Sequence, residues 1–175
     1  MRDGETAQIA VQSALTGHLV LSTLHTNTAA GAITRMQDMG VESYLITSSV
    51  NGVLAQRLVR TLCAHCKESY VPDAQLLAST GLGRFCAPGQ PIYRAVGCEH
   101  CRHTGYRGRT GIYELLVLDE PLRRAIIEGR DANSLHTLAA QSGMLNIFED
   151  GLRKVAAGTT TLDELARVTQ DHADA

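Results

Sequence analysis

The chain has 175 residues, of which 44% are hydrophobic and 19% are charged, and its net charge is −2. This length suits one domain or two small ones, and the composition is that of a globular protein rather than a disordered one. The slight negative charge disfavours a dedicated nucleic-acid binder, which must neutralise phosphates, so we expect no nucleic-acid partner. Apolar runs are too short to cross a bilayer, so membrane association would go through a partner or a further segment.

The first third of the chain is typical of an α/β domain. Helical spacing of apolar residues predicts helices over residues 5–15, 28–39 and 42–55. Residues 18–24 form a short apolar run with β-branched members, the pattern of a strand buried on both faces of a parallel sheet. Residues 56–62 alternate imperfectly and predict a further strand.

The middle of the chain, residues 63–105, is rich in Gly, Pro and Cys and is interpreted as an insert held by a metal ion. We expect one short helix near residues 73–79 and a strand at residues 91–96 within it. Residues 107–118 carry two glycines before an apolar run, which predicts a turn followed by a strand.

The remainder of the chain is predicted to be helical. Asp119 can cap a helix through residues 122–128, and further helices are expected over residues 133–141 and 147–156. The sequence from Thr161 to Glu164 predicts a capping box, in which each side chain accepts a hydrogen bond from the other residue's backbone N–H.

Four cysteines stand in two Cys-x-x-Cys pairs, Cys63 with Cys66 and Cys98 with Cys101. Zinc favours four soft or borderline ligands at tetrahedral corners, and a two-residue spacer lets one tight turn present two thiolates to one ion. A structural zinc (Zn²⁺) site is therefore the first hypothesis.

Other interpretations of these cysteines stay open. The loop of about thirty residues between the pairs is longer than the commonest zinc-ribbon spacing, so free or redox-active thiols are an alternative. His65, His100 and His103 lie within or beside the pairs, so a mixed Cys/His site is another. Cys86 is interpreted as an unpaired thiol on a loop.

Polar side chains begin abruptly where the predicted strand of residues 18–24 ends. Ligands of parallel α/β sheets bind beyond the carboxyl ends of the strands, so His25 and the neighbouring hydroxyls could hydrogen-bond a phosphate. The alternative is that His25 only satisfies local backbone groups. Arg57 and Arg60 likewise suit either a nucleotide phosphate or a carboxylate on a neighbouring element.

Several motifs follow one another in a fixed order along nearly the whole chain. They occupy residues 2–7, 16–27, 54–60, the two cysteine pairs, and residues 105–114, 150–155 and 158–164. In this order they closely resemble the secretion ATPases of bacterial type II secretion and type IV pilus assembly. The stretch Leu-Ala-Gln-Arg-Leu-Val-Arg at residues 54–60 looks most like the type II secretion ATPase, with the pilus-assembly ATPase close behind.

The resemblance implies a fold and a set of partners. Residues 1–62 would be the C-terminal part of a RecA-like P-loop ATPase domain, residues 63–105 a zinc-binding subdomain, and residues 106–175 a small, mainly helical domain. The whole would be a cytoplasmic homo-hexamer, peripheral on the inner membrane, that uses ATP and Mg²⁺. Its partners would be inner-membrane platform proteins, through which it would indirectly move pseudopilin subunits. On the alternative interpretation, the subunits moved would be those of a type IV pilus.

The resemblance also suggests residue roles. The family's His box corresponds to residues 17–27, which makes His25 the expected γ-phosphate contact and catalytic residue. Arg2 and Asp3 match the end of the Walker B motif, although without that context they would be solvated charges at a helix end. The residues carried over as nucleotide contacts are Arg2, Asp3, Thr23, His25, Arg57 and Arg60.

One departure from the family pattern matters. The phosphate-binding loop, the acidic box and the acidic Walker B residue would all lie upstream of Met1, which stands where the motif has Ile. We therefore expect a C-terminal fragment that does not hydrolyse ATP alone, because phosphoryl transfer depends on positioning and charge stabilisation by those groups. The alternative is a catalytically inactive adaptor module of the secretion machinery, stapled by zinc.

Overall fold

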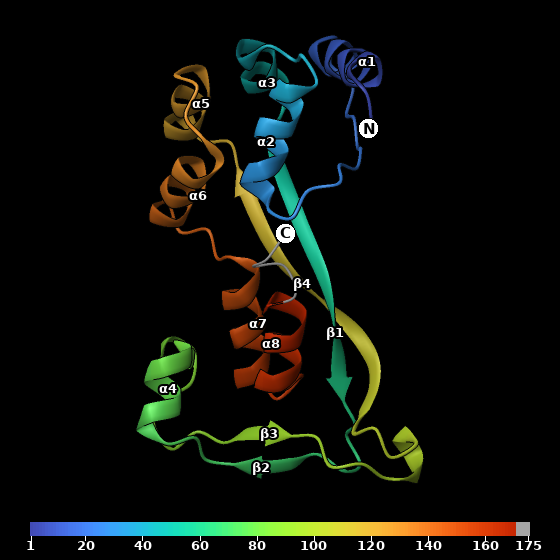
Figure 1. Cartoon of the computed structure of the whole chain (residues 1–175), viewed down its shortest axis with the longest axis vertical. Helices are drawn as coiled ribbons and strands as arrows, with labels where there is room; N and C mark the ends of the chain where they lie inside the picture. Colours follow the sequence, from blue (N-terminus) through green and yellow to red (C-terminus); the bar gives the residue numbers. More distant parts are fainter. Residues whose placement is uncertain (171–175) are drawn as a thin grey trace. The chain divides into compact units, whose positions relative to one another are not determined.

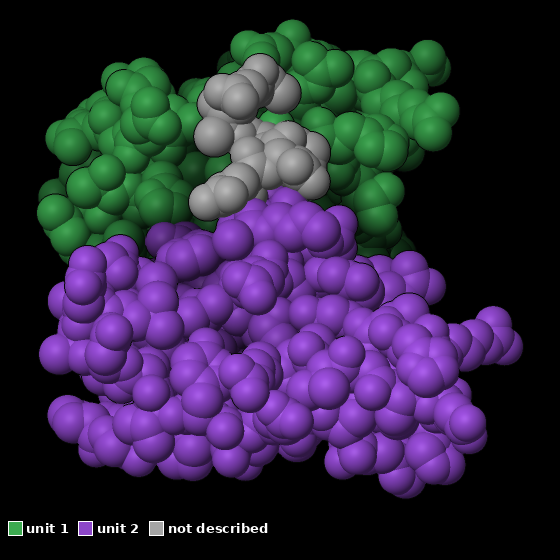
Figure 2. Space-filling model, turned by 60° about the horizontal axis from the view of Figure 1, so that its bottom comes forward, with its two compact units in different colours: residues 1–55, 114–145 green, residues 56–113, 146–175 purple. Residues whose placement is uncertain are grey.

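The computed structural model describes residues 1–170 of the chain. These residues form two compact units, which Figure 2 shows in different colours. Unit 1 comprises residues 1–55 and 114–145, and unit 2 comprises residues 56–113 and 146 onward. The division into three domains expected from the sequence stays a prediction. Among the described residues, no helix is both long and apolar enough to span a membrane.

Unit 1 is mainly helical (Figure 1). Its helices are α1 (Gly4–Leu15), α2 (Ala29–Asp38), α3 (Ser43–Ser49), α5 (Glu120–Ile127) and α6 (Ala132–Gln141). Four of them begin at a side chain that accepts a backbone N–H of the first turn, and these caps are Asp3, Thr28, Asp119 and Asp131. Their apolar faces bury one core, which includes Ile33, Ile46, Leu116, Leu122, Ile126 and Leu135. The helices predicted at residues 5–15, 28–39, 122–128 and 133–141 are thereby confirmed.

Unit 2 combines short strands with helices. It contains β2 (Glu68–Tyr70), α4 (Ala74–Thr80), β3 (Ile92–Arg94), α7 (Ile147–Ala156) and α8 (Leu162–Gln170), with 3₁₀ turns at Leu82–Arg84 and Glu99–Cys101. β2 and β3 pair antiparallel, with Ser69 opposite Tyr93. Leu82, Ile92, Ile112, Val155 and Leu165 are fully buried and supply the apolar interior of the unit. The predicted elements near residues 73–79, 91–96 and 147–156 are confirmed.

The longest strands, β1 (Gly52–Leu62) and β4 (Tyr106–Val117), are hydrogen-bonded neighbours in a two-stranded sheet (Figure 1). Just beyond one end of the pair the Leu118 N–H donates to the Asn51 carbonyl, and just beyond the other the Cys63 N–H donates to the Gly105 carbonyl. The two strands therefore run in opposite directions. β1 confirms the strand predicted at residues 56–62 and begins four residues earlier.

The helix predicted over residues 42–55 is too long, because α3 ends at Ser49 and the chain then becomes extended. Val50 has φ −89° and ψ 125°, and β1 begins at Gly52. A Cβ on Gly52 would lie 3.0 Å from the Leu116 carbonyl oxygen, so the close approach of β4 favours glycine there. Strand pairing with a distant segment has overridden the local helical pattern.

The turn predicted within residues 107–118 is also wrong, because β4 runs without interruption from Tyr106 to Val117. Gly108 takes a positive φ of 83° inside the strand. Such a conformation is open to glycine at little cost and is typical of a local distortion of the pleat rather than a chain reversal. Glycines that looked like turn residues are strand residues here.

The strand predicted at residues 18–24 is not formed. This segment makes no strand pairing within residues 1–170, and Leu19 and Leu21 are 83% and 87% exposed. A strand of a parallel sheet needs neighbours on its edges and cover on its faces, and among the described residues no strand pairs with this segment and most of it is exposed. The apolar pattern is present without the partners that it requires.

Candidate metal centre and phosphate-contacting residues

The Sγ atoms of Cys63, Cys66, Cys98 and Cys101 all lie within 4.8 Å of one another in unit 2. The Cys63–Cys98 separation is 4.0 Å, the Cys66–Cys101 separation is 3.8 Å and the Cys98–Cys101 separation is 3.9 Å. Four sulfurs at tetrahedral corners around zinc, each about 2.3 Å from the ion, would be about 3.8 Å apart. The cluster therefore has the size of a tetrahedral thiolate site.

Two glycines allow the chain to wrap around the cysteine cluster. Gly97 has φ 119°, and a Cβ there would lie 2.6 Å from the His103 carbonyl oxygen. Gly105 has φ 77°, and its Cβ would lie 2.6 Å from the Ala95 side chain. Both backbone N–H groups donate to cluster sulfurs, the Gly97 N–H to Cys66 at 3.3 Å and the Gly105 N–H to Cys101 at 3.2 Å. The turns thus orient amide dipoles toward sulfur, as a thiolate cluster requires.

Two thiols of the cluster are perturbed in opposite directions. Burial raises the pKa of Cys66 to about 12, against a smaller opposing effect of the Gly97 N–H. Burial would also raise the pKa of Cys101, but hydrogen bonds from the Cys98 and Gly105 N–H groups outweigh it and lower the pKa to about 6. A lowered pKa favours the thiolate, the form that binds metal.

The neighbouring histidines and the fifth cysteine do not belong to this cluster. The His65 and His100 rings stack on each other, with centroids 4.1 Å apart and planes 20° apart. The group found among the described residues consists of the four cysteines alone, so the mixed Cys/His alternative is not what the structure forms. Cys86 is buried elsewhere in unit 2, where desolvation raises its pKa.

His25 and Thr23 lie on the extended segment before α2 and are both exposed. The segment is held in place on each side of His25, since Leu24 packs against the unit 1 core and Thr28 caps α2. The amino group of Met1 donates to the Thr23 carbonyl at 2.7 Å, which brings residues 1–3 alongside the segment. The structure thus gathers four of the predicted nucleotide contacts in unit 1.

Two of those contacts sit at the start of α1. Asp3 accepts a hydrogen bond from the Thr6 N–H at 2.8 Å, which lowers the pKa of its carboxyl group. Arg2 is exposed. Asp3 therefore performs the helix-end role that its position suggested on local grounds, and any contact with a nucleotide would be additional.

Arg57 and Arg60 belong to unit 2 and have protein partners. The Arg57 guanidinium donates to the Val168 carbonyl at 2.8 Å. The Arg60 guanidinium makes two hydrogen bonds to the Glu164 carboxylate, at 2.8 and 2.6 Å, and lies over the Tyr106 ring. For Arg60 the structure thus forms the carboxylate contact that was one of its two interpretations, and a nucleotide contact by either arginine stays a prediction.

Glu164 makes one contact that the sequence predicts and several that it does not. Its backbone N–H donates to the Thr161 hydroxyl at 3.1 Å, as the predicted capping box requires. Its carboxylate, however, accepts from the Arg60 N–H and from the Arg60 and Arg167 guanidinium groups. The reciprocal bond of the box is replaced by contacts to β1, a partner 104 residues away. A complete capping box forms instead between Asn146 and Glu149 of α7.

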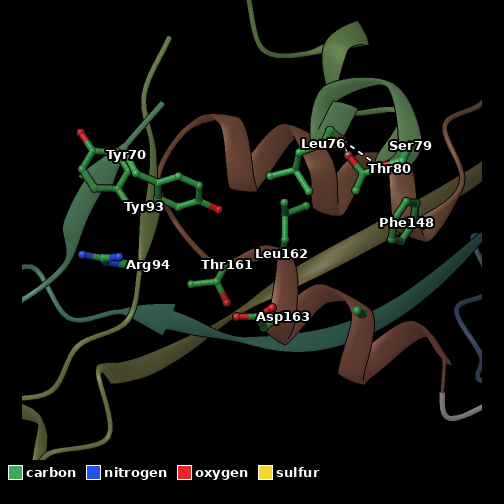
Figure 3. A pocket seen from close by; sticks show the side chains of 11 residues that line it. Tyr70, Leu76, Ser79, Thr80, Tyr93, Arg94, Phe148, Thr161, Leu162 and Asp163 are labelled. Atoms are coloured by element: carbon green, nitrogen blue, oxygen red, sulfur yellow. Dashed lines mark hydrogen bonds between the residues drawn. The ribbon is translucent and has the colours of Figure 1, made fainter. Parts of the chain in front are cut away.

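A pocket of about 440 Å³ is also in unit 2 (Figure 3). It is bordered by Tyr70 and Tyr93 from β2 and β3, by Leu76 of α4, and by Leu162 and Asp163 of α8. Arg94 at its rim is already paired with Glu68 at 2.7 Å. The pocket contains none of the residues predicted to contact nucleotide or metal.

The fold matches parts of two solved structures. The pilus retraction motor PilT, solved with bound ADP, aligns with a TM-score of 0.63 at 23% identity, over 100% of this chain and 39% of PilT. The ATPase DotB of Legionella pneumophila aligns with a TM-score of 0.57 at 21% identity, over 95% of this chain and 36% of DotB. The chain therefore has the RecA-like α/β fold of a part of these two proteins, as its sequence predicted.

Sequence comparison narrows this class. The family described as Type II/IV secretion system protein matches residues 1–167, and the chain belongs to that family. It is 53% identical over 171 residues to type II secretion system protein E of Dickeya dadantii, which covers 98% of this chain and 33% of the relative. It is 50% identical over 171 residues to the type IV pilus assembly ATPase PilB of Thermus thermophilus, which covers 97% of this chain and 19% of the relative. The chain thus spans about a third of the type II relative's length.

We expect Glu164→Gln to lower the free energy of unfolding at pH 7 by about 1–3 kcal/mol, because the variant loses charged hydrogen bonds in a buried position. Burial alone would raise the pKa of Glu164, but hydrogen bonds from Arg167 and Arg60 lower it from 4.5 to about 2. The depressed pKa means that this stabilisation is complete above pH 5 and is lost as the pH falls toward 2.

Urea unfolding at pH 7, 5 and 3 measures this effect. The stability gap between wild type and Glu164→Gln should shrink between pH 5 and pH 3, whereas Glu120→Gln, at a 79% exposed carboxylate, should leave stability nearly unchanged. A gap that stays constant across this range would contradict the assigned pKa.

Proposed function

We propose that this chain is the C-terminal part of a type II secretion ATPase that couples ATP binding and hydrolysis to pseudopilus assembly and protein export. The observation that carries the proposal is the 53% identity to type II secretion system protein E over 98% of the chain. The protein would act as a homo-hexamer on the cytoplasmic face of the inner membrane, with platform proteins as partners and pseudopilins as indirect cargo.

Within this function, the exposed imidazole of His25 would contact the γ-phosphate of ATP, with Thr23, Arg2 and Asp3 nearby. The fixed positions of Leu24 and Thr28 support this role, because a phosphate contact must be held in place before it can stabilise charge. Arg57 and Arg60 would contribute from the neighbouring motif. The sequence contains no Gly-x-x-x-x-Gly-Lys-Ser/Thr loop, so ATP and Mg²⁺ would be held mainly by other segments.

A second function is favoured by one observation, the 50% identity to a type IV pilus assembly ATPase. On this alternative the cargo is a pilus subunit. A third possibility is that the chain is a catalytically inactive adaptor, a binding module of the secretion machinery whose fold is stabilised by zinc.

A chimera tests the proposed function. The matching third of the Dickeya dadantii protein is replaced by this chain in a strain that lacks that protein. We expect the chimera to restore export of type II substrates, and its His25→Ala variant to lose at least about tenfold in ATP hydrolysis, because a contact to developing charge is removed. The corresponding PilB chimera is tested for pilus assembly.

The two chimeras separate the alternatives. Restored export with no restored pili supports type II secretion, and restored pili alone supports the pilus function. If neither chimera works although both are folded and abundant, the ATPase proposal fails and the adaptor interpretation takes its place.

We further expect the isolated chain to hydrolyse no ATP above the rate of its own His25→Ala variant. Phosphate-loop amides and the loop lysine supply most of the positioning in phosphoryl transfer, and this sequence lacks that loop. A coupled phosphate-release assay on purified protein measures the rate. Turnover that disappears in the His25→Ala variant would refute this prediction.

We also propose that Cys63, Cys66, Cys98 and Cys101 hold a structural Zn²⁺ ion and that residues 63–105 act as a zinc-binding subdomain. Sulfur separations of 3.8–4.0 Å and N–H donors aimed at the sulfurs support this assignment. The ion would cross-link the two turns and take no part in phosphoryl transfer.

The purified chain should contain about one zinc ion, measured by elemental analysis, and Cys98→Ser should lose it, because a tetrahedral site has no spare ligand. Cys86→Ser is the control, since Cys86 is a free cysteine of the same unit outside the cluster. Chelation should speed hydrogen exchange in residues 63–105 and at the end of α7, where Gln90 and Lys67 donate to the Ala156 and Gly158 carbonyls. Uniform exchange across α5 and α6 as well would contradict a local structural site.

A further inference from the structure

Glu114 is a buried carboxylate in unit 1 whose role the motif around it does not explain. It lies near the end of β4, and the residue is only 3% exposed. Removing a carboxylate from water costs free energy unless it is hydrogen-bonded or paired. Its two oxygens therefore need partners inside the unit.

One oxygen of Glu114 holds the start of α2. Glu114 Oε1 accepts a hydrogen bond of 2.8 Å from the Ala29 N–H, the first amide of the helix. Thr28 caps the same turn by accepting from the Gly31 N–H at 3.1 Å. A negative charge at a helix N-terminus is stabilised by the helix dipole as well as by the hydrogen bond, so this contact is strong and directional.

The other oxygen of Glu114 faces α6. His136 Nε2 lies 3.7 Å from Glu114 Oε2, and the His136 side chain is 33% exposed. The carboxylate thus stands between the first amide of α2 and an imidazole of α6, and two elements restrict its movement. The contact to Ala29 links residues that are 85 positions apart in sequence.

The anchored amide is four residues from His25. Leu24 is packed against the unit 1 core immediately before His25, and Glu114 fixes the chain at Ala29 shortly after it. His25 itself is exposed, and its ring makes no hydrogen bond with the described residues. The position of the imidazole therefore depends on the two fixed points that flank it.

We propose that Glu114 is a positioning residue for His25, acting through the Ala29 N–H at the start of α2. The inference rests on the proposed role of His25 at the γ-phosphate. A misplacement of about 1 Å in a group that stabilises the transition state can cost up to about a hundredfold in rate, without a matching loss of nucleotide binding.

A double-mutant cycle in the Dickeya chimera tests the coupling. Glu114→Gln keeps an acceptor oxygen but loses the charge, and we expect kcat for ATP hydrolysis to fall about tenfold while the KM for ATP changes less than about threefold. In the His25→Ala background the same substitution should have almost no further effect, because the residue it positions is gone. Glu128→Gln, at an exposed carboxylate of the same unit, is the control.

The outcomes are distinguishable. An inactive wild-type chimera refutes the proposed function. In that case, hydrogen exchange on the 175-residue chain tests whether Glu114 anchors the start of α2. There Glu114→Gln should speed exchange at least about fivefold in residues 25–31 while α3 stays protected, and unchanged exchange would overturn the anchor. In an active chimera, equal losses of kcat in the wild-type and His25→Ala backgrounds would show a purely structural role and overturn the proposal.

Discussion

The antiparallel pairing of β1 with β4 is the constraint on which the rest of the structure depends. Both strands run from one compact unit into the other, so the residues that each strand buries help to define both cores. Leu116 belongs to the unit 1 core, while Val59 and Ile112 are fully buried in unit 2. The pairing also explains why residues 50–55 leave the helical state, because their backbone groups find partners across the strand pair.

A two-stranded sheet leaves two edges that need cover, and the chain covers part of the β1 edge from its own C-terminal region. Within unit 2 the Leu62 N–H donates to the Thr159 carbonyl at 2.8 Å, and the Thr160 hydroxyl donates to the Arg60 carbonyl at 2.8 Å. Glu164 accepts from the Arg60 N–H. Glu164 and Glu114 each join a long strand to the N-terminal turn of a helix, because the Glu164 carboxylate on α8 accepts from β1 and the Glu114 carboxylate on β4 accepts from α2.

The sequence predicts what is decided by neighbours in the chain. The cap at Asp119 is predicted because a side-chain cap needs only the next three residues, and Asp3 and Thr28 cap their helices in the same local way. It does not predict contacts that depend on distant partners, such as Glu114 with the Ala29 N–H. The strand wrongly predicted at residues 18–24 has the same cause, because an apolar run forms a strand only when other strands are available to pair with it.

The cysteine cluster and the predicted nucleotide contacts differ in whether their residues come from one unit or from both. The four clustered cysteines come from two turns of a single unit, and the glycines that close those turns stand beside them, so spacing in the sequence was sufficient to predict the cluster. The predicted nucleotide contacts are divided between units, with His25 in unit 1 and Arg60 in unit 2. The proposed metal site is therefore complete within one unit, whereas the proposed nucleotide contacts come from residues of both units.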